Sequence, residues 1–107
     1  MPVGMENRLV ADIFKALSSP VRLHILKLLK DGPQCVCKII GELGTEQSNT
    51  SQHLAVLKSA GLVDSQKEGL KVIYSVKHPE ILGVINAIEK IILAQTEETQ
   101  KLLKNAM

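Results

Sequence analysis

Two cysteines separated by a single residue, Cys35 and Cys37, are the side chains in this sequence with the clearest capacity for chemistry. The 107-residue chain has no other cysteine, so the pair does not belong to a framework of several disulfides such as holds small secreted domains together. A close pair of thiols is instead typical of a metal or redox site. Thiolates are soft ligands, and the ions that they select include As(III), Sb(III), Cd(II), Pb(II), Cu(I) and Zn(II).

Three interpretations of this pair stay open from the residues alone. The two sulfurs can bind one metalloid or metal ion, and because As(III) takes about three thiolates and Zn(II) usually four ligands, two sulfurs favour As(III) or Sb(III) over Cd(II) or Zn(II). The pair can also be a redox switch, since a Cys-x-Cys disulfide closes a small ring that is easily reopened. Finally, both residues can be small apolar side chains packed in a helix.

The position of the pair bears on the first interpretation. Hydrophobic spacing predicts a short helix over residues 34–43, with both cysteines near its start. In a regular helix, side chains two positions apart point about 200° away from each other. We therefore expect both sulfurs to reach one ion only if this turn unwinds, which would distort the helix.

The next stretch, residues 47–63 (QSNTSQHLAVLKSAGLV), predicts a helix with a polar outer face. Leu54 and Leu57 share its inner face with Thr50. The outer stripe holds small and amide side chains, namely Ser48, Ser51, Gln52, Ala55 and Ser59. Without a carboxylate, this stripe can approach a phosphate backbone and hydrogen-bond to base edges. An ordinary amphipathic surface helix is the alternative.

The neighbouring segments favour the DNA-binding interpretation. Two short helices joined by a tight turn are typical of a helix-turn-helix. Residues 62–76 predict a two-stranded hairpin with Gly69 at its tip and Lys67 and Lys71 on either side. A cationic hairpin beside a recognition helix is typical of a wing that contacts phosphates, although lysines also keep a free hairpin edge soluble. The predicted fold class is mainly α with a small β-hairpin wing.

Three further helices are predicted over residues 5–17, 20–30 and 79–104. The last of them is apolar around most of its circumference, through Ile81, Leu82, Val84, Ile85, Ile88, Ile91, Ile92 and Leu93. Such a helix must be buried on more than one side. Because a small monomer does not offer two burying surfaces, we predict a homodimer formed through the first and last helices.

Composition and charge reduce the number of function classes that the sequence allows. Residues 1–77 carry ten Lys and Arg against seven Asp and Glu, so the basic excess lies with the helix-turn-helix. The aromatic residues are only Phe14 and Tyr74, which argues against binding single-stranded nucleic acid by stacking. No catalytic triad, carboxylate pair or Gly-rich phosphate loop is visible, so we do not expect an enzyme. Without a signal peptide or an apolar run of about 18 residues, a cytoplasmic protein with no membrane partner is expected.

The order helix, helix, helix, recognition helix, wing, helix resembles the ArsR/SmtB family of winged-helix repressors. Residues 14–26 (FKALSSPVRLHIL) resemble the family's opening "aLadptRl.IL", and residues 51–63 (SQHLAVLKSAGLV) resemble its recognition segment "S.HL..L..AGLV". The segment Cys35-Val36-Cys37 stands where metal- and metalloid-sensing members carry a "CVC" motif. The resemblance covers roughly residues 8–93.

This resemblance implies one winged helix-turn-helix domain over residues 1–107, with a core of about 8–93 and a dimerisation helix of about 79–104. It also implies a homodimer on double-stranded operator DNA and repression that an inducer relieves. The DNA-binding residues that it implies are Gln47, Ser48, Asn49, Thr50, Ser51, Gln52, His53, Lys58, Lys67 and Lys71. His53 either faces the DNA or holds the helix against its neighbour.

The resemblance also implies an inducer site at Cys35 and Cys37, with no obligatory cofactor and with As(III), Sb(III) or another thiophilic metal as the inducer. Family members often add a third cysteine one turn on, where this sequence has Ile40, so a third ligand would come from a small thiol, from water, or not at all. A thiol-redox-responsive regulator that uses the same pair is the alternative. The non-repressor alternatives are a winged-helix module for protein contacts and a small thiol-redox or metal-handling protein.

Overall fold

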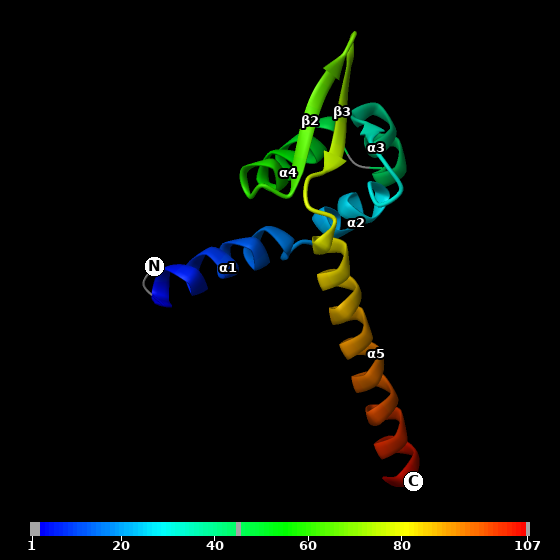
Figure 1. The fold of residues 1–107 in the computed structure, drawn as a ribbon. Coiled ribbons are helices and arrows are strands. Elements are labelled where there is room, and N and C mark those ends of the chain that lie inside the picture. The colour runs from blue at the N-terminus through cyan, green and yellow to red at the C-terminus, as the bar shows by residue number, and fades with distance from the viewer. Residues whose placement is uncertain (1–2, 45, 107) are drawn as a thin grey trace.

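The computed structural model describes residues 3–44 and 46–106, which form five helices and three strands. In chain order these are α1 (Val3–Leu17), α2 (Pro20–Leu28), β1 (Gln34–Cys35), α3 (Val36–Leu43), α4 (Gln47–Ser59), β2 (Val63–Glu68), β3 (Lys71–Val76) and α5 (Glu80–Ala106). Figure 1 shows that α2, α3, α4 and the strands form a head, from whose base α1 and α5 extend in different directions. The predicted order of helices and wing is confirmed.

The break between α1 and α2 arises from local sequence chemistry. Ser19 adopts an extended backbone and caps α2, because its side chain accepts a hydrogen bond from the backbone N–H of Arg22 at 3.3 Å. Pro20 follows in the first turn, where a missing N–H costs nothing. The chain can therefore turn sharply between the two helices and begin α2 with the backbone N–H of Arg22 paired.

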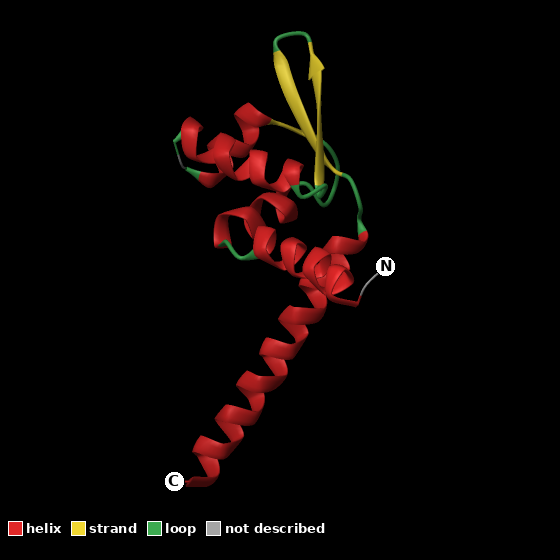
Figure 2. Ribbon diagram, turned by 90° about the vertical axis from the view of Figure 1, so that its left-hand side faces the viewer, coloured by secondary structure: helices red, strands yellow, loops and turns green. Residues whose placement is uncertain are grey.

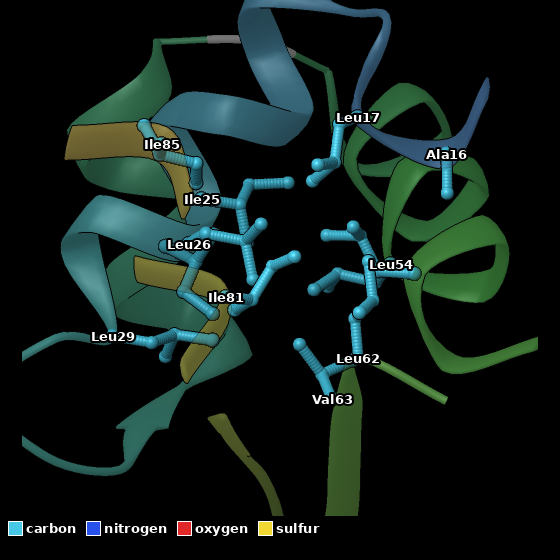
Figure 3. Packing of buried hydrophobic residues seen from close by; sticks show 12 residues of the cluster. Ala16, Leu17, Ile25, Leu26, Leu29, Leu54, Leu62, Val63, Ile81 and Ile85 are labelled. Carbon is cyan, nitrogen blue, oxygen red and sulfur yellow. The ribbon is translucent and has the colours of Figure 1, made fainter. Parts of the chain in front are cut away.

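The hydrophobic core lies where α2 and α4 meet the start of β2 and the first turns of α5. Its fully or almost fully buried members are Ala16, Leu17, Ile25, Leu26, Leu29, Ile39, Leu54, Leu57, Leu62, Val63, Ile81 and Ile85. Figure 3 shows side chains of α2 and α5 meeting those of α4 and β2 across this core. Aliphatic packing of this kind fixes the angle of α4 against the rest of the head.

Replacing Leu26 with alanine is expected to lower the free energy of unfolding by about 2–5 kcal/mol, because the truncation leaves a cavity in a close-packed core. The Leu26 side chain has an exposed fraction of 0%. Leu70→Ala is the matched control, since Leu70 is fully exposed and should change the stability by less than about 0.5 kcal/mol. Urea unfolding at one fixed protein concentration measures both, and equal stabilities of the two variants would contradict the assigned core.

The wing belongs to a three-stranded antiparallel sheet with the order β1-β3-β2. The predicted hairpin is confirmed, and Gly69 occupies its turn with a positive φ of 64°, a conformation that favours glycine. The third strand was not predicted: Gln34 pairs with Tyr74, and Cys35 pairs with Ile73. The predicted helix over residues 34–43 is therefore wrong at its start, because α3 begins only at Val36.

Much of the apolar surface of α1 and α5 has no cover within the chain. Only Ile81 and Ile85 of the described α5 residues are buried, and the helix continues away from the head (Figure 2). The exposed large apolar side chains of these two helices are Met5, Leu9, Val10 and Phe14 on α1 and Val84, Ile88, Ile91, Ile92, Leu93, Leu102 and Leu103 on α5. Exposed apolar surface of this extent is typical of an interface.

Despite these apolar residues, no helix within residues 3–44 and 46–106 is long and apolar enough to cross a membrane.

Candidate DNA-binding surface and cysteine site

The two faces of α4 differ as the sequence predicts. Leu54 and Leu57 pack inward, and Thr50 is fully buried with them. The exposed residues in the first half of α4 are Gln47, Ser48, Asn49, Ser51 and Gln52. All of these were predicted DNA contacts, and the structure brings them together on one polar surface. The burial of Thr50 removes it from that surface, because a side chain without solvent exposure does not reach a phosphate or a base.

Arg22 of α2 holds the recognition helix to the rest of the head. Its Nη1 lies 3.2 Å from His53 Nδ1, its Nε donates to the Ala16 carbonyl at 2.6 Å, and its Nη2 donates to the Lys15 carbonyl at 3.4 Å. A guanidinium only donates hydrogen bonds, so His53 Nδ1 acts as the acceptor and the ring proton of the neutral form resides on Nε2. The second of the two roles predicted for His53 is therefore present in this structure.

Sequence reasoning did not assign a function to Arg22. Its only signal was its place in the segment 14–26, where it matches the "R" of the family's opening. The contact with His53 spans 31 positions along the chain, so no local pattern could show it. Arg22 thus belongs to the positioning of α4, although it is not part of the polar outer surface.

The predicted lysines lie on α4 and on the wing. Lys58 Nζ donates to Ser65 Oγ at 2.6 Å and so links the end of α4 to β2. Lys67 and Lys71 are exposed near the tip of the hairpin, one on each strand. Figure 2 shows this hairpin projecting from the helices. Both exposed lysines therefore lie on the projecting hairpin, as the phosphate contacts predicted for a wing require.

The cysteine pair lies at the junction between β1 and α3. Cys35 has an extended backbone and is the N-cap of α3, and its Sγ accepts a hydrogen bond from the backbone N–H of Cys37 at 3.1 Å. The two sulfurs are joined in a disulfide, with a Cα–Cα distance of 5.3 Å. This corrects the prediction that the first turn must unwind, because Cys35 precedes the helix and both sulfurs already meet.

A pocket of about 450 Å³ opens beside the cysteines. Cys35 and Cys37 line one side of it, and residues of α4 and β3 line the others. Gln47, Ser51 and Lys71, all predicted to contact DNA, are among these lining residues. The cysteines and the candidate DNA-binding surface therefore share one cavity, a proximity that no sequence pattern had indicated.

A third protein ligand near the cysteines is not found in the described part of the chain. Across residues 3–44 and 46–106, no group of three or more His, Cys, Asp or Glu side chains could hold a metal ion. The position one turn beyond Cys37 is Ile40, which lines the same pocket. A metal or metalloid site at Cys35 and Cys37 therefore stays a prediction, and such a site would have two protein sulfurs after reduction of the disulfide.

Comparisons with known proteins agree with this architecture. The profile of the family described as "Bacterial regulatory protein, arsR family" matches residues 19–65. An uncharacterized HTH-type transcriptional regulator of Methanocaldococcus jannaschii is 44% identical over 82 residues, which are 76% of this chain and 92% of the relative. The HTH-type transcriptional regulator YgaV of Escherichia coli is 36% identical over 85 residues, covering 76% of this chain and 83% of YgaV.

Solved structures show the same fold. The crystal structure of Rv0081 from Mycobacterium tuberculosis superposes with a TM-score of 0.78 at 33% identity, covering 86% of this chain and 93% of that one. Family, relatives and neighbours are DNA-binding regulators and not enzymes. The winged helix-turn-helix and these matches together show that the chain belongs to the ArsR/SmtB family of transcriptional repressors.

Proposed function

We propose that this protein is a homodimeric repressor that leaves its operator DNA when arsenite or antimonite bridges Cys35 and Cys37. The observation that carries the proposal is the meeting of both sulfurs at the start of α3, inside a pocket shared with α4 and the wing. An inducer bound there touches the elements that would bind DNA. The whole chain then acts as one winged helix-turn-helix domain, with α5 as its dimerisation helix.

The exposed surface of α4 supports the DNA-binding part of this proposal. Amide and hydroxyl groups such as those of Asn49, Ser51 and Gln52 both donate and accept hydrogen bonds, as base edges in the major groove require. Lys67 and Lys71 on the wing would contact phosphates, while Lys58 braces α4 against β2. The Arg22–His53 contact would keep α4 at a fixed angle as it enters the groove.

The uncovered apolar side chains of α1 and α5 support the homodimer. A second copy of the chain would bury Phe14 of α1 together with Ile88 and Ile91 of α5, which are about half exposed. One solved neighbour, from Mycobacterium bovis, is described as a homodimeric winged helix-turn-helix DNA-binding domain. It is 28% identical with a TM-score of 0.78, and the match covers 89% of this chain and 88% of that one.

The chemistry of induction follows from two thiols. When As(OH)₃ reacts with Cys35 and Cys37, two As–S bonds form, two As–O bonds break, and two water molecules leave with the thiol protons. Arsenic stays trivalent and keeps one hydroxyl group. Two sulfurs without a third protein ligand suit this reaction better than they suit zinc, which usually takes four ligands. If arsenic binds the free protein better than the DNA-bound protein, DNA affinity falls by linkage.

A redox switch is the second candidate, because the two cysteines are disulfide-bonded in this structure. An oxidant of the azo class such as diamide would accept two electrons and two protons from the thiols and become a hydrazine, while the S–S bond forms. Among the solved neighbours, HlyU of Vibrio cholerae is described in a reduced form. It is 31% identical with a TM-score of 0.73, covering 80% or more of both chains.

One titration separates these candidates. Fluorescence anisotropy would follow the binding of reduced protein to DNA from upstream of its own gene, without additive, with arsenite, and with diamide in place of arsenite. We expect arsenite to raise the apparent Kd of the wild type at least about tenfold, a typical coupling between two sites. Cys35→Ser/Cys37→Ser is the control and should keep its DNA affinity.

Each outcome decides between the proposals. Release of the wild type by diamide alone would replace the metalloid mechanism with the redox switch. Release of the cysteine-free variant by arsenite would place the inducer elsewhere. DNA binding that neither compound changes would overturn both mechanisms and leave an uninduced repressor.

A further inference from the structure

Arg22 joins two helices that have different tasks in the proposed repressor, since α1 helps to form the dimer and α4 enters the operator. Its Nε donates to the Ala16 carbonyl at 2.6 Å and its Nη2 donates to the Lys15 carbonyl at 3.4 Å. Its Nη1 lies 3.2 Å from His53 Nδ1 in α4. Because the guanidinium is planar and rigid, one side chain holds the end of α1 and the middle of α4 in a fixed arrangement.

The helix α1 has few other attachments to the head. Among residues 4–17, only Ala16 and Leu17 are buried, and the rest of the helix extends away from the head (Figure 1). The carbonyls of Lys15 and Ala16 belong to the last four of the helix, which have no partner inside it, and Arg22 pairs with both. The direction of α1 therefore depends on its last turn and on Arg22.

A groove of about 540 Å³ lies between α1 and α4 beside this contact. Asp12 and Lys15 of α1 line one side, Ala55 and Ser59 of α4 line the other, and Arg22 is also part of the lining. Side chains of the two helices do not interdigitate across a groove, so close packing does not fix the angle between the helices there. The polar contacts of Arg22 supply the missing constraint.

The angle between α1 and α4 matters because a dimer must place two recognition helices at once. Operator half-sites lie one helical turn of DNA, or a multiple of it, apart. In the proposed dimer α1 contacts the partner, so the angle between α1 and α4 contributes to the separation of the two α4 helices. An error in that separation would leave one of them outside its groove.

We infer that Arg22 is a positioning residue for operator recognition: by tying the end of α1 to His53 of α4, it sets the half-site spacing that the dimer accepts. The inference rests on the proposed homodimeric repressor and is independent of the inducer. A second connection from the interface to the core runs through Ile81 and Ile85 of α5, which are buried. Loss of Arg22 should therefore relax the spacing requirement without abolishing DNA binding.

The test measures how the affinity depends on the spacing of the half-sites. Footprinting on DNA from upstream of the gene would first locate the two half-sites, and fluorescence anisotropy would then compare that spacing with one inserted base pair. The insertion rotates one half-site by roughly 34° relative to the other. We expect it to raise the Kd of the wild type at least about thirtyfold, and that of Arg22→Met less than about fivefold.

A duplex with a single half-site separates positioning from general damage to the head. No spacing has to be matched on this duplex, so Arg22→Met should bind it within about threefold of the wild type. On the intact operator the same variant should bind at least about tenfold more weakly, because it loses part of the avidity of paired binding. A variant whose α4 is merely destabilised would lose affinity on both duplexes alike.

Two further substitutions control for folding and for charge. Arg22→Lys keeps the positive charge but cannot reach three acceptors with a planar fork, so it should relax the spacing requirement as Arg22→Met does. It also carries the test if circular dichroism shows that Arg22→Met does not fold. Lys30→Met removes the same charge from an exposed position just beyond α2, and it should keep the spacing dependence of the wild type.

A double-mutant cycle tests whether Arg22 acts through His53. His53→Leu removes the acceptor of the contact, and it should relax the spacing requirement on its own. If the two residues act as one unit, the variant with both Arg22→Met and His53→Leu should show the same spacing dependence as either single variant. Independent contributions would instead multiply.

The outcomes distinguish this inference from the function on which it rests. A monomeric wild type, or one that does not bind the upstream DNA, would contradict the proposed function itself. If the dimeric wild type binds but tolerates the inserted base pair, or if the Arg22 variants keep its spacing dependence, Arg22 does not set the spacing and the repressor stands. Equal losses on the single half-site and the operator, or multiplied effects in the double variant, would overturn the inference in the same way.

Discussion

Replacing Ile88 with glutamate is expected to convert the proposed homodimer into monomers and to weaken operator binding at least about a hundredfold. Ile88 lies on the uncovered apolar face of α5, where its side chain is 40% exposed. In a dimer, the new carboxylate would be buried among apolar side chains without a partner, which is strongly unfavourable. A monomer carries one recognition helix and gains nothing from the second half-site, so the avidity of paired binding is lost.

The control for this substitution adds the same charge on the other side of the helix. Asn86 is exposed and lies two positions before Ile88, so the two side chains point in nearly opposite directions. Asn86→Glu should remain dimeric and bind DNA within a few-fold of the wild type. Light scattering coupled to gel filtration gives the mass, and fluorescence anisotropy gives the affinity. A dimeric Ile88→Glu variant, or a monomeric one with unchanged affinity, would contradict the proposed interface.

The helices could be predicted from the sequence because each has a local signal. Ser19 and Pro20 supply a cap and a first-turn proline, and the structure confirms that α2 begins there. Gly69 was placed at the hairpin tip, and its positive φ confirms that placement. Such signals depend on neighbouring residues alone, so they can be recognised in the sequence without knowledge of the tertiary structure.

The start of α3 could not be predicted because it depends on a distant strand. β1 has two residues, too few to show alternation, and Cys35 is held extended by pairing with Ile73. Because an apolar residue at position 35 also fits the helical spacing of the residues that follow it, the sequence favoured a helix that begins before Val36. The consequence for the site is direct, because the extended Cys35 is what lets its sulfur meet that of Cys37.

The binding surface was predicted in part, and Thr50 shows where two arguments disagreed. Helical periodicity placed Thr50 on the inner face of the recognition helix, whereas its position in the family resemblance included it among the DNA contacts. The structure supports the periodicity, since the Thr50 side chain is fully buried. The pocket beside the cysteines was missed entirely, because it is assembled from β1, α3, α4 and β3, which no single stretch of sequence contains.

The polar face of α4 gives the last prediction. Gln52→Glu changes an amide into a carboxylate of the same shape, so it removes the two N–H donors of the amide and adds a negative charge. Gln52 is exposed in the first half of α4, among the residues proposed to enter the major groove. We expect a loss of about 1–3 kcal/mol per half-site, and therefore a fall in operator affinity of about thirtyfold or more for a symmetric dimer.

Gln100→Glu makes the same chemical change at an exposed position near the end of α5, far from α4 in Figure 1. Both variants alter the net charge equally, so an effect of net charge alone would lower the DNA affinity in each. We expect only Gln52→Glu to lose affinity, and to lose more on operator DNA than on unrelated duplex DNA measured at the same salt concentration. Equal losses in the two variants would mean that α4 does not enter the groove by this face, and the recognition surface would have to be sought elsewhere.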